Sequence, residues 1–183
     1  MLLDKFKKFF SKQPTWQDIE RFEPSWQDRI SLMAQHIHSD DQSVLDIGCG
    51  PMWLKKYLPD GVLYIGLDYI SRGEECIVCD LNVENLPPVS AHTFFISGCL
   101  EYILDTEKFI KSVSESAKKV IISYCALDDF SELREREIRG WKNHLYIAEL
   151  IDSFEHKGMR LKSKEYSKEN NVILVFLRST STI

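Results

Sequence analysis

The sequence has no excess of positive charge. Its 183 residues carry 23 Lys and Arg against 28 Asp and Glu, a formal net charge of -5 at pH 7. Proteins that bind a nucleic-acid backbone usually carry clustered positive charge, so this balance disfavours DNA or RNA as a partner. Hydrophobic residues make up 44% of the chain. A chain of this length and composition buries one sizeable core, which fits one domain better than two.

Long apolar runs are also missing. The longest, around residues 172–177, is too short to span a bilayer, and the first residues lack the apolar core of a secretion signal. We therefore expect a cytoplasmic protein. Residues 1–12 place three phenylalanines among lysines, a composition compatible with peripheral contact to an anionic membrane. The favoured interpretation is a mobile or self-packing N-terminal arm or lid over residues 1–24, followed by a domain of residues 25–183.

A cysteine framework is absent as well. The five cysteines are an odd number scattered through strand-like runs, which favours reduced, buried thiols without a redox role. Cys76 and Cys79 have the C-x-x-C spacing of zinc and redox sites, but no second ligand pair lies at a convincing spacing. Residues three apart in a strand point to opposite faces, so these two cannot easily share a metal. We predict no metal site.

Short apolar runs alternate with amphipathic segments along most of the chain. Continuous apolar runs suit strands buried on both faces, and they occur at 43–47, 62–68, 76–80, 93–97, 119–124 and 171–177. Helices are expected at 26–37, 52–58, 105–117 and 144–158. This alternation predicts βαβ units and a parallel sheet covered on both faces. Residues 158–177 hold two strand candidates joined by a polar turn, which predicts a final antiparallel hairpin.

The stretch VLDIGCGPMW, residues 44–53, places an acid and two glycines between a predicted strand and a predicted helix. Gly48 and Gly50 allow a tight turn and close approach of a ligand to the backbone. The second strand ends in Asp68, about twenty residues on, where an acid can accept hydrogen bonds from ribose hydroxyls, and the third ends in Asp80. Ligands of open parallel sheets bind beyond the carboxyl ends of the strands. The three strand ends together predict a nucleoside site.

The third glycine of a dinucleotide-binding loop is absent, because Pro51, Met52 and Trp53 follow Gly50. This disfavours NAD, whose pyrophosphate needs exposed backbone amides at the start of a helix. The acid Asp46 would repel a phosphate but favour a cationic amine or sulfonium. We therefore expect a nucleoside cofactor without a phosphate.

Four stretches resemble successive motifs of the class I S-adenosylmethionine-dependent methyltransferases: VLDIGCG, YIGLD, VCDLN and SGCLEYILD. The resemblance covers about residues 26–177. The resemblance implies a Rossmann-like α/β fold of seven strands in the order 3-2-1-4-5-7-6, with strand 7 antiparallel and helices on both faces. It also implies S-adenosyl-L-methionine as the cofactor. The residues it assigns are Asp46, Gly48, Cys49 and Gly50 around the methionine portion, Asp68 at the ribose hydroxyls, Asp80 and Leu81 at the adenine, and Tyr69 and Ser97 as further cofactor contacts.

The sequence departs from the family pattern at three places. The usual third loop glycine is Met52, which would narrow the pocket for the cofactor's tail, and the histidine of the LEH pattern is Tyr102, which removes an immediate base candidate. The segment between the second and third strands, residues 69–75, is too short for a full helix. Cofactor binding tolerates such changes more readily than activity does.

Three residues are candidates on the acceptor side. Methyl transfer from a sulfonium is an in-line displacement that needs alignment, exclusion of water and, for some acceptors, a base, but no covalent nucleophile. His144 could act as a general base or cap a helix. Tyr124 could donate a hydrogen bond to the acceptor or pack in the core. Glu101 could contact cofactor or acceptor, or be an acid at a helix start.

The charge-rich segment 128–140 predicts a solvated helix, and its position after the fifth strand also allows a lid. Trp16, Phe22 and Trp141 are aromatic candidates for a pocket wall.

The favoured function is methyl transfer to a hydroxyl or similar group of a small molecule or glycan precursor. The alternative is a methyltransferase-like module that binds S-adenosylmethionine, its product or a protein partner without turnover. Protein methylation is a third interpretation and requires a peptide groove. The acceptor, the atom methylated and the oligomeric state are not determined by the sequence.

Overall fold

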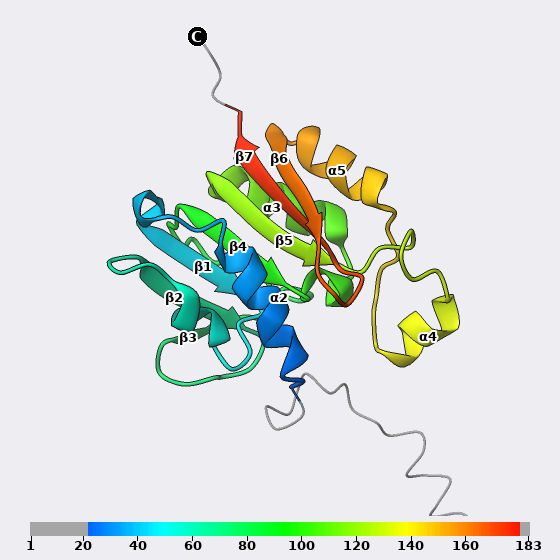
Figure 1. The fold of residues 1–183 in the computed structure, drawn as a ribbon, viewed down its shortest axis with the longest axis horizontal. Coiled ribbons are helices and arrows are strands. Elements are labelled where there is room, and N and C mark those ends of the chain that lie inside the picture. The colour runs from blue at the N-terminus through cyan, green and yellow to red at the C-terminus, as the bar shows by residue number, and fades with distance from the viewer. Residues whose placement is uncertain (1–21, 180–183) are drawn as a thin grey trace, which may run out of the picture.

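The computed structural model describes residues 22–179, which form one seven-stranded sheet in the order β3-β2-β1-β4-β5-β7-β6 (Figure 1). The strands are β1 (Ser43–Ile47), β2 (Leu63–Asp68), β3 (Cys76–Val78), β4 (Thr93–Ser97), β5 (Lys119–Tyr124), β6 (Met159–Tyr166) and β7 (Val172–Arg178). Strands β1 to β5 are parallel, and β7 pairs antiparallel with both β5 and β6. The order, the orientation and the final hairpin predicted from the sequence are confirmed.

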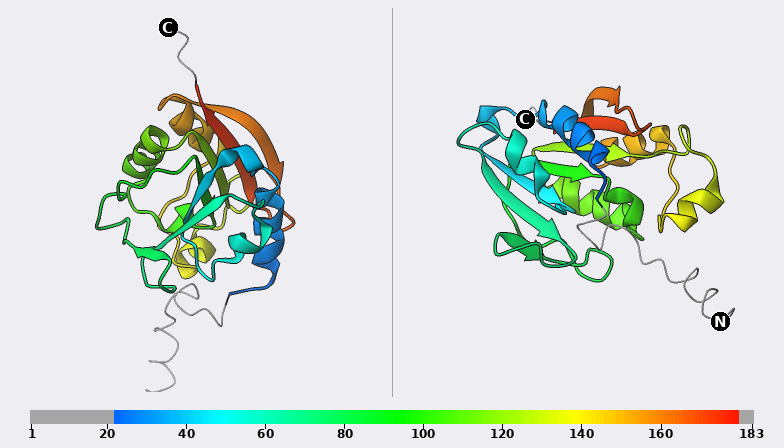
Figure 2. Two further views of the ribbon diagram at one scale, coloured as in Figure 1. Left: turned by 90° about the vertical axis from the view of Figure 1, so that its left-hand side faces the viewer. Right: turned by 60° about the horizontal axis from the view of Figure 1, so that its bottom comes forward.

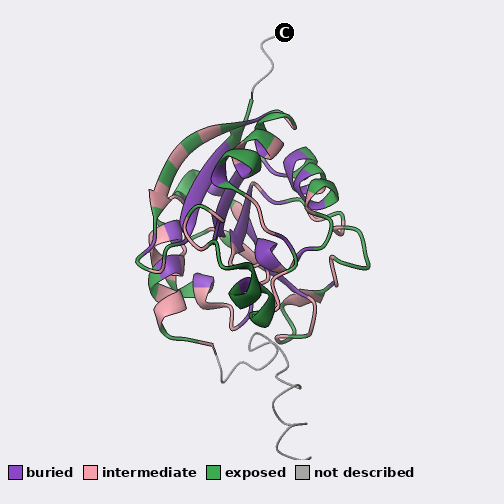
Figure 3. Ribbon diagram, turned by 90° about the vertical axis from the view of Figure 1, so that its right-hand side faces the viewer, coloured by how far each residue is buried: buried purple, intermediate pink, exposed green. Residues whose placement is uncertain are grey.

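Helices cover both faces of the sheet, as expected (Figure 2). The α-helices are α2 (Ser25–Ala34), α3 (Thr106–Ser116), α4 (Leu133–Ile138) and α5 (Ile147–Glu155). Because successive side chains of a strand point to opposite faces, Phe94 packs in the core with α3 and α5, and Phe95 packs in the core with α2. The central strand β5 is buried at every residue, whereas edge strand β6 alternates between exposed and less exposed positions. Figure 3 shows this buried centre.

Several helices are shorter than their sequence patterns suggest. The helix expected over 26–37 ends at Ala34. The helix expected over 144–158 is α5, which begins only at Ile147. The helix expected at 52–58 is the 3₁₀ turn η4 (Trp53–Tyr57), preceded by Met52 in a left-handed conformation that an α-helix does not contain. Only six residues of segment 128–140 form α4.

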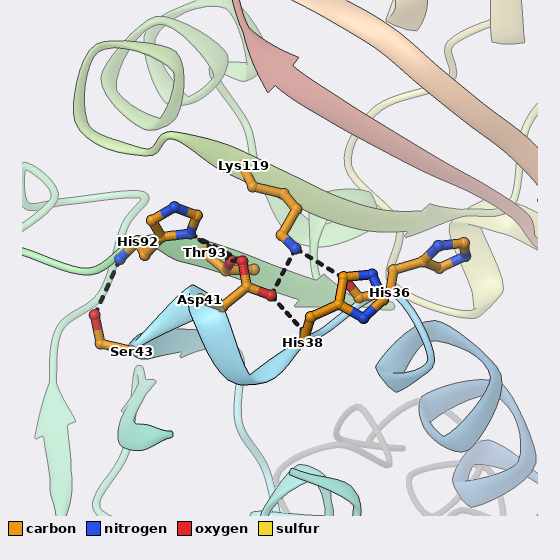
Figure 4. Close-up of polar contacts among 7 residues, drawn as sticks. All are labelled: His36, His38, Asp41, Ser43, His92, Thr93 and Lys119. Atoms are coloured by element: carbon orange, nitrogen blue, oxygen red, sulfur yellow. Dashed lines mark hydrogen bonds and ion pairs between the residues drawn. The ribbon is translucent and has the colours of Figure 1, made fainter. Parts of the chain in front are cut away.

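A buried polar network closes the amino ends of β1, β4 and β5, the opposite edge of the sheet from their carboxyl ends (Figure 4). Asp41 is its centre: Lys119 Nζ donates to Oδ2 at 2.6 Å and Thr93 Oγ1 donates to Oδ1 at 3.0 Å. The backbone N–H of His38 also donates to Oδ2, at 2.7 Å, and His92 Nδ1 lies 2.9 Å from Oδ1. The network joins the loop after α2 to two central strands.

Within residues 22–179, no helix is both long enough and apolar enough to cross a membrane. Residues 1–21 of the expected N-terminal arm, together with the membrane contact considered for residues 1–12 and the pocket role considered for Trp16, lie outside the described residues.

Candidate functional site

A cavity of about 1020 Å³ lies at the carboxyl ends of the first four strands. This is where open parallel sheets bind their ligands. The cofactor and catalytic candidates that line it are Gly48, Asp68, Tyr69, Asp80, Leu81, Ser97 and Glu101. Phe22 and Trp141, the two other aromatic wall candidates, also line it. The cofactor and catalytic candidates that do not line it are Asp46, Cys49, Gly50, Tyr124 and His144.

The glycine turn after β1 is held against the end of β2. The backbone N–H groups of Gly48 and Cys49 both donate to the carbonyl of Leu67, at 2.8 and 3.0 Å. Gly48 and Gly50 have positive φ values of 74° and 47°. A Cβ at Gly48 would lie 2.8 Å from the side chain of Cys99, and one at Gly50 would lie 2.6 Å from the ring of Phe22. Both glycines are therefore required, Gly48 at the cavity surface and Gly50 beneath an aromatic ring.

Asp68, at the end of β2, is buried and held by its own chain on one side. Its Oδ2 accepts a hydrogen bond from Gly50 N at 2.9 Å and lies 3.2 Å from Arg72 Nε. Its Oδ1 lies at a longer 3.4 Å from Ile70 N. The guanidinium of Arg72 lies 5.6 Å from the centre of the Phe22 ring. The carboxylate is thereby oriented with Oδ1 as the less engaged oxygen.

Asp46 lies in β1, just before the glycine turn, and is not part of the cavity lining. Its side chain is buried and accepts a hydrogen bond from the Tyr64 hydroxyl at 2.8 Å. Burial raises the pKa of Asp46 to about 7, and the nearby charge of Asp68 adds to that rise, against the opposing effect of the Tyr64 hydrogen bond. The carboxyl that the sequence assigned to the methionine portion therefore lies behind the cavity wall.

Arg29, on α2, is a buried cavity residue that the sequence analysis did not single out. Its Nε donates to Ser97 Oγ at 3.1 Å, and its Nη1 lies 3.8 Å from Glu169 Oε2. The guanidinium also packs on Gly98, where a Cβ would lie 2.8 Å from Nη2. A signal was present: Arg29 lies three residues after Trp26 and so shares the buried face of the helix.

Glu101 presents a buried carboxyl group to the cavity. It lies in the turn η5 (Leu100–Tyr102) after β4 and is 2% exposed. Its Oε1 accepts a hydrogen bond from Cys125 N at 3.0 Å, and its Oε2 is buried with no hydrogen-bond partner among residues 22–179. Burial raises the pKa of Glu101, against hydrogen bonds to the carboxylate and the charges of Arg29 and Arg136. One carboxyl oxygen is thus anchored, and the other is buried without a hydrogen-bond partner among the described residues.

Tyr124 and His144, the two other catalytic candidates, lie together but away from the cavity lining. The Tyr124 hydroxyl donates to Asn143 Oδ1 at 2.7 Å and accepts from Arg136 Nη2 at 3.1 Å. His144 Nδ1 accepts from Arg136 Nε at 3.0 Å. Burial raises the pKa of Tyr124 to about 12. Both side chains are parts of a network centred on one arginine.

That arginine reverses the pattern expected of segment 128–140. Arg136 is 0% exposed, donates to the carbonyl of Cys125 at 2.8 Å, and lies 4.8 Å from the centre of the Trp141 ring. The apolar Leu133 and Ile138 of the same helix are 52% and 68% exposed. The helix is solvated as expected at every position except Arg136. Arg136 anchors the segment, and its neighbours Phe130, Ile138, Arg139 and Trp141 form a wall of the cavity.

The departures from the family pattern are visible in the same region. Met52 adopts φ 57° and ψ 35°, the left-handed conformation that favours glycine, and it does not line the cavity. Tyr102 does line it, and burial raises its pKa to about 12. No helix connects β2 to β3, as the short segment 69–75 predicted.

No family model and no curated protein matches the sequence. Solved structures do. One chain in the complex between the Haloferax volcanii Trm112 methyltransferase activator and the putative methyltransferase is 13% identical, with a TM-score of 0.68 over 85% of this chain and 91% of that chain. Magnesium protoporphyrin IX methyltransferase (ChlM) from Synechocystis PCC 6803, solved with bound SAH, is 15% identical, with a TM-score of 0.67 over 97% of this chain and 94% of that chain.

The O-methyltransferase NcsB1 from neocarzinostatin biosynthesis, in complex with S-adenosylmethionine and 2-hydroxy-5-methyl naphthoic acid, is 14% identical, with a TM-score of 0.65 over 83% of this chain. The match covers 53% of NcsB1, so this chain spans about half of that protein. At these identities the likeness concerns the fold alone. The chain has the Rossmann-like fold of class I methyltransferases.

Proposed function

We propose that this protein binds S-adenosyl-L-methionine in the cavity beyond β1 to β4 and transfers its methyl group to a hydroxyl or similar group of a small molecule or glycan precursor. The observation that carries the proposal is the presence, in one cavity, of a glycine turn, the oriented carboxylate of Asp68 and the half-engaged buried carboxyl of Glu101. Structures of the same fold with S-adenosylmethionine or SAH bound support it.

The charges around the cavity fit this cofactor. S-adenosylmethionine carries one carboxylate, and Arg29 is the buried cation beside the end of β4, close to the glycine turn. Asp68 Oδ1 is the oxygen available to ribose hydroxyls. Asp80 and Leu81 line the part of the cavity after β3 and suit the adenine. Gly48 lines the cavity and has no side chain, and its backbone packs so closely on Cys99 that a side chain there would collide with it.

When bound, the cofactor supplies an electrophilic methyl group on a sulfonium, and the protein must align an acceptor oxygen and remove its proton. We assign proton removal to Glu101 Oε2, which is buried in a residue that lines the cavity and has no hydrogen-bond partner within the described chain. A carboxyl with a raised pKa is a stronger base than an exposed one. Tyr124 and His144 act indirectly in this proposal, by holding Arg136.

Calorimetric titration of S-adenosylmethionine and SAH into the purified protein tests the cofactor assignment. Asp68→Ala removes the proposed ribose contact, and Asp60→Ala, at an exposed loop position, is the matched control. We expect micromolar binding that is lost only in Asp68→Ala. Absence of binding to the folded wild-type protein would overturn the proposal.

The Glu101→Gln variant separates catalysis from binding. The amide keeps the oxygen that accepts from Cys125 N but cannot remove a proton. In a methyl-transfer screen over phenols, hydroxy acids and sugars, we expect loss of turnover of about 10² or more with unchanged cofactor affinity. A wild-type protein that binds the cofactor and methylates nothing in the screen would favour the non-catalytic module instead.

A further inference from the structure

Cys49 and Cys76 are in contact across the sheet. Their Sγ atoms lie 3.8 Å apart, although 27 positions separate the residues in the sequence. The C-x-x-C partner of Cys76 behaves differently, because the Sγ of Cys79 points to the carbonyl of Asn85 at 3.6 Å. The sequence spacing pairs Cys76 with Cys79, whereas the fold pairs it with the cysteine between the two glycines of the cofactor turn.

A glycine on β2 makes this contact possible. Gly66 is in register with Asp46 on one side and with Cys76 on the other. It has no side chain, and a Cβ there would lie 3.1 Å from the Sγ of Cys49, closer than ordinary contact. The two sulfurs therefore meet over the backbone of β2 in space that any other residue would fill.

We propose that Cys49 and Cys76 form a reversible disulfide that closes the glycine turn onto β3 and weakens cofactor binding. The effect on the cofactor rests on the function proposed above, whereas the bond itself does not. All five cysteines are free thiols in the structure. No group of three or more potential metal ligands exists in the described part of the chain, so the pair is not half of a metal site there.

The chemistry begins at Cys76, which is half-buried, whereas Cys49 is buried. Burial, together with the charges of Asp46 and nearby groups, raises the pKa of the Cys49 thiol, so the more accessible Cys76 is the thiol that the oxidant meets first and Cys49 is the resolving partner. A peroxide oxidises the Cys76 thiol to a sulfenic acid and releases water. The Cys49 thiol then gives up its proton as its sulfur attacks the Cys76 sulfur, forming the S–S bond, while the sulfenic S–O bond breaks and the hydroxyl leaves with that proton as a second water. One peroxide is reduced for each disulfide formed.

The disulfide would move the glycine turn, because Cys49 lies in that turn between Gly48 and Gly50. A disulfide has an S–S length of about 2.05 Å, so the sulfurs must approach by roughly 1.8 Å from their present contact. The neighbouring Gly50 N–H donates to Asp68, and the Cys49 N–H donates to the carbonyl of Leu67. Movement of the turn disturbs the bonds that orient the proposed ribose acceptor. We expect cofactor affinity to fall at least tenfold on oxidation.

The experiment exposes the full-length protein to graded hydrogen peroxide and maps its peptides under non-reducing conditions. We expect a cross-link between the peptides that contain Cys49 and Cys76, and we expect dithiothreitol to reverse it. The cross-link should form in the wild type and in the control Cys79→Ser. It should be absent in Cys76→Ser and in Cys49→Ala. A cross-link between Cys76 and Cys79 instead, or none between Cys49 and Cys76 while other thiols oxidise, would overturn the proposal.

Calorimetry on the same samples measures the consequence. We expect peroxide to weaken S-adenosylmethionine binding in the wild type and in Cys79→Ser, with recovery after reduction, and to leave Cys76→Ser unchanged. A formed disulfide with undiminished affinity would overturn the regulatory role. A reduced protein without affinity would overturn the proposed function instead, and the peptide map would still decide whether the disulfide forms.

Discussion

Arg72 Nε lies 3.2 Å from Asp68 Oδ2, and both side chains are buried at the edge of the cavity. The pair forms within a segment too short to make a helix between β2 and β3, so Arg72 folds back onto the strand end instead. With Gly50 N it occupies Oδ2, whereas Oδ1 accepts only a long bond from Ile70 N among the hydrogen bonds described above. The arginine thus compensates the buried charge and orients the group in one step.

Replacing the carboxylate tests this orientation. Asp68→Asn keeps the size of the side chain and loses the charge. Hydrogen bonds to charged groups contribute about 1.5–3 kcal/mol, so we expect the affinity for S-adenosylmethionine to fall by about tenfold or more. Isothermal titration calorimetry measures it, with Asp60→Asn as the exposed control. Equal affinities in the two variants would remove Asp68 from the site.

Met52 offers a prediction about stability. A residue other than glycine in the left-handed region costs about 1–2 kcal/mol, while glycine loses about 0.5–1 kcal/mol through its greater freedom in the unfolded chain. Because Met52 has φ 57°, we expect Met52→Gly to raise the free energy of unfolding by about 0.5–1 kcal/mol. Urea denaturation measures this. Met52→Ala retains the backbone penalty and serves as control, so an equal gain in both variants would contradict the backbone explanation.

The sheet was predictable because its signals are local. Continuous apolar runs such as 119–124 indicate buried strands. Residues 158–177 contain two strand candidates with only a short turn between them, which indicates the antiparallel hairpin. The strand-end acids Asp68 and Asp80 were predictable for the same reason, since parallel strands bring their carboxyl ends to one edge.

The interior of the site was less predictable, because it depends on contacts distant in the sequence. Arginines are usually exposed, so the sequence gives no sign that Arg136 is buried and only the helical spacing from Trp26 as a sign for Arg29. The sequence makes Tyr124 and His144 candidates for contact with the methyl acceptor, whereas in the structure both form hydrogen bonds with Arg136. The contact of Cys49 with Cys76 depends on the register of three strands, which residue spacing does not contain.

Arg136 provides a test of how the cavity wall is held. Among the described residues no carboxylate lies within ion-pair distance of it, and its guanidinium is satisfied by carbonyls, the Tyr124 hydroxyl and His144. Arg136→Met removes these bonds and leaves buried acceptors unpaired, each at about 1–3 kcal/mol. We expect unfolding to become easier by about 2–4 kcal/mol and proteolysis to accelerate within 127–142.

Urea denaturation and limited proteolysis of Arg136→Met measure these effects. The exposed neighbour Arg134→Met is the matched control and should stay within about 0.5 kcal/mol of the wild type. The same loss in both variants would show that the charge of the segment, rather than the buried network, stabilises the wall.

Asp41 lies at the amino ends of the strands, opposite the cavity, and its ionisation makes the stability of the fold depend on pH (Figure 4). Burial alone would raise the pKa of Asp41, but hydrogen bonds from Lys119 Nζ and His38 N, with the charge of Lys119, outweigh it and hold the pKa below its usual value. A carboxylate whose pKa is lower in the folded state stabilises the fold above its unfolded pKa of about 3.9 and loses that contribution as the pH falls further. We therefore expect this contribution to be present in full at pH 7 and to fade below about pH 4.

Asp41→Asn isolates the contribution from those of other carboxyl groups. At pH 7 the variant leaves the buried Lys119 without a carboxylate of opposite charge, which costs up to about 3–5 kcal/mol, and this difference from the wild type should shrink as the pH falls from about 4 toward 2. Urea denaturation at a series of pH values measures it, and the exposed Asp40→Asn should follow the wild type throughout. If the difference between wild type and Asp41→Asn stayed constant down to pH 2, Asp41 would stabilise the fold by its shape and not by its charge, because only an ionised carboxylate with a lowered pKa produces the pH dependence.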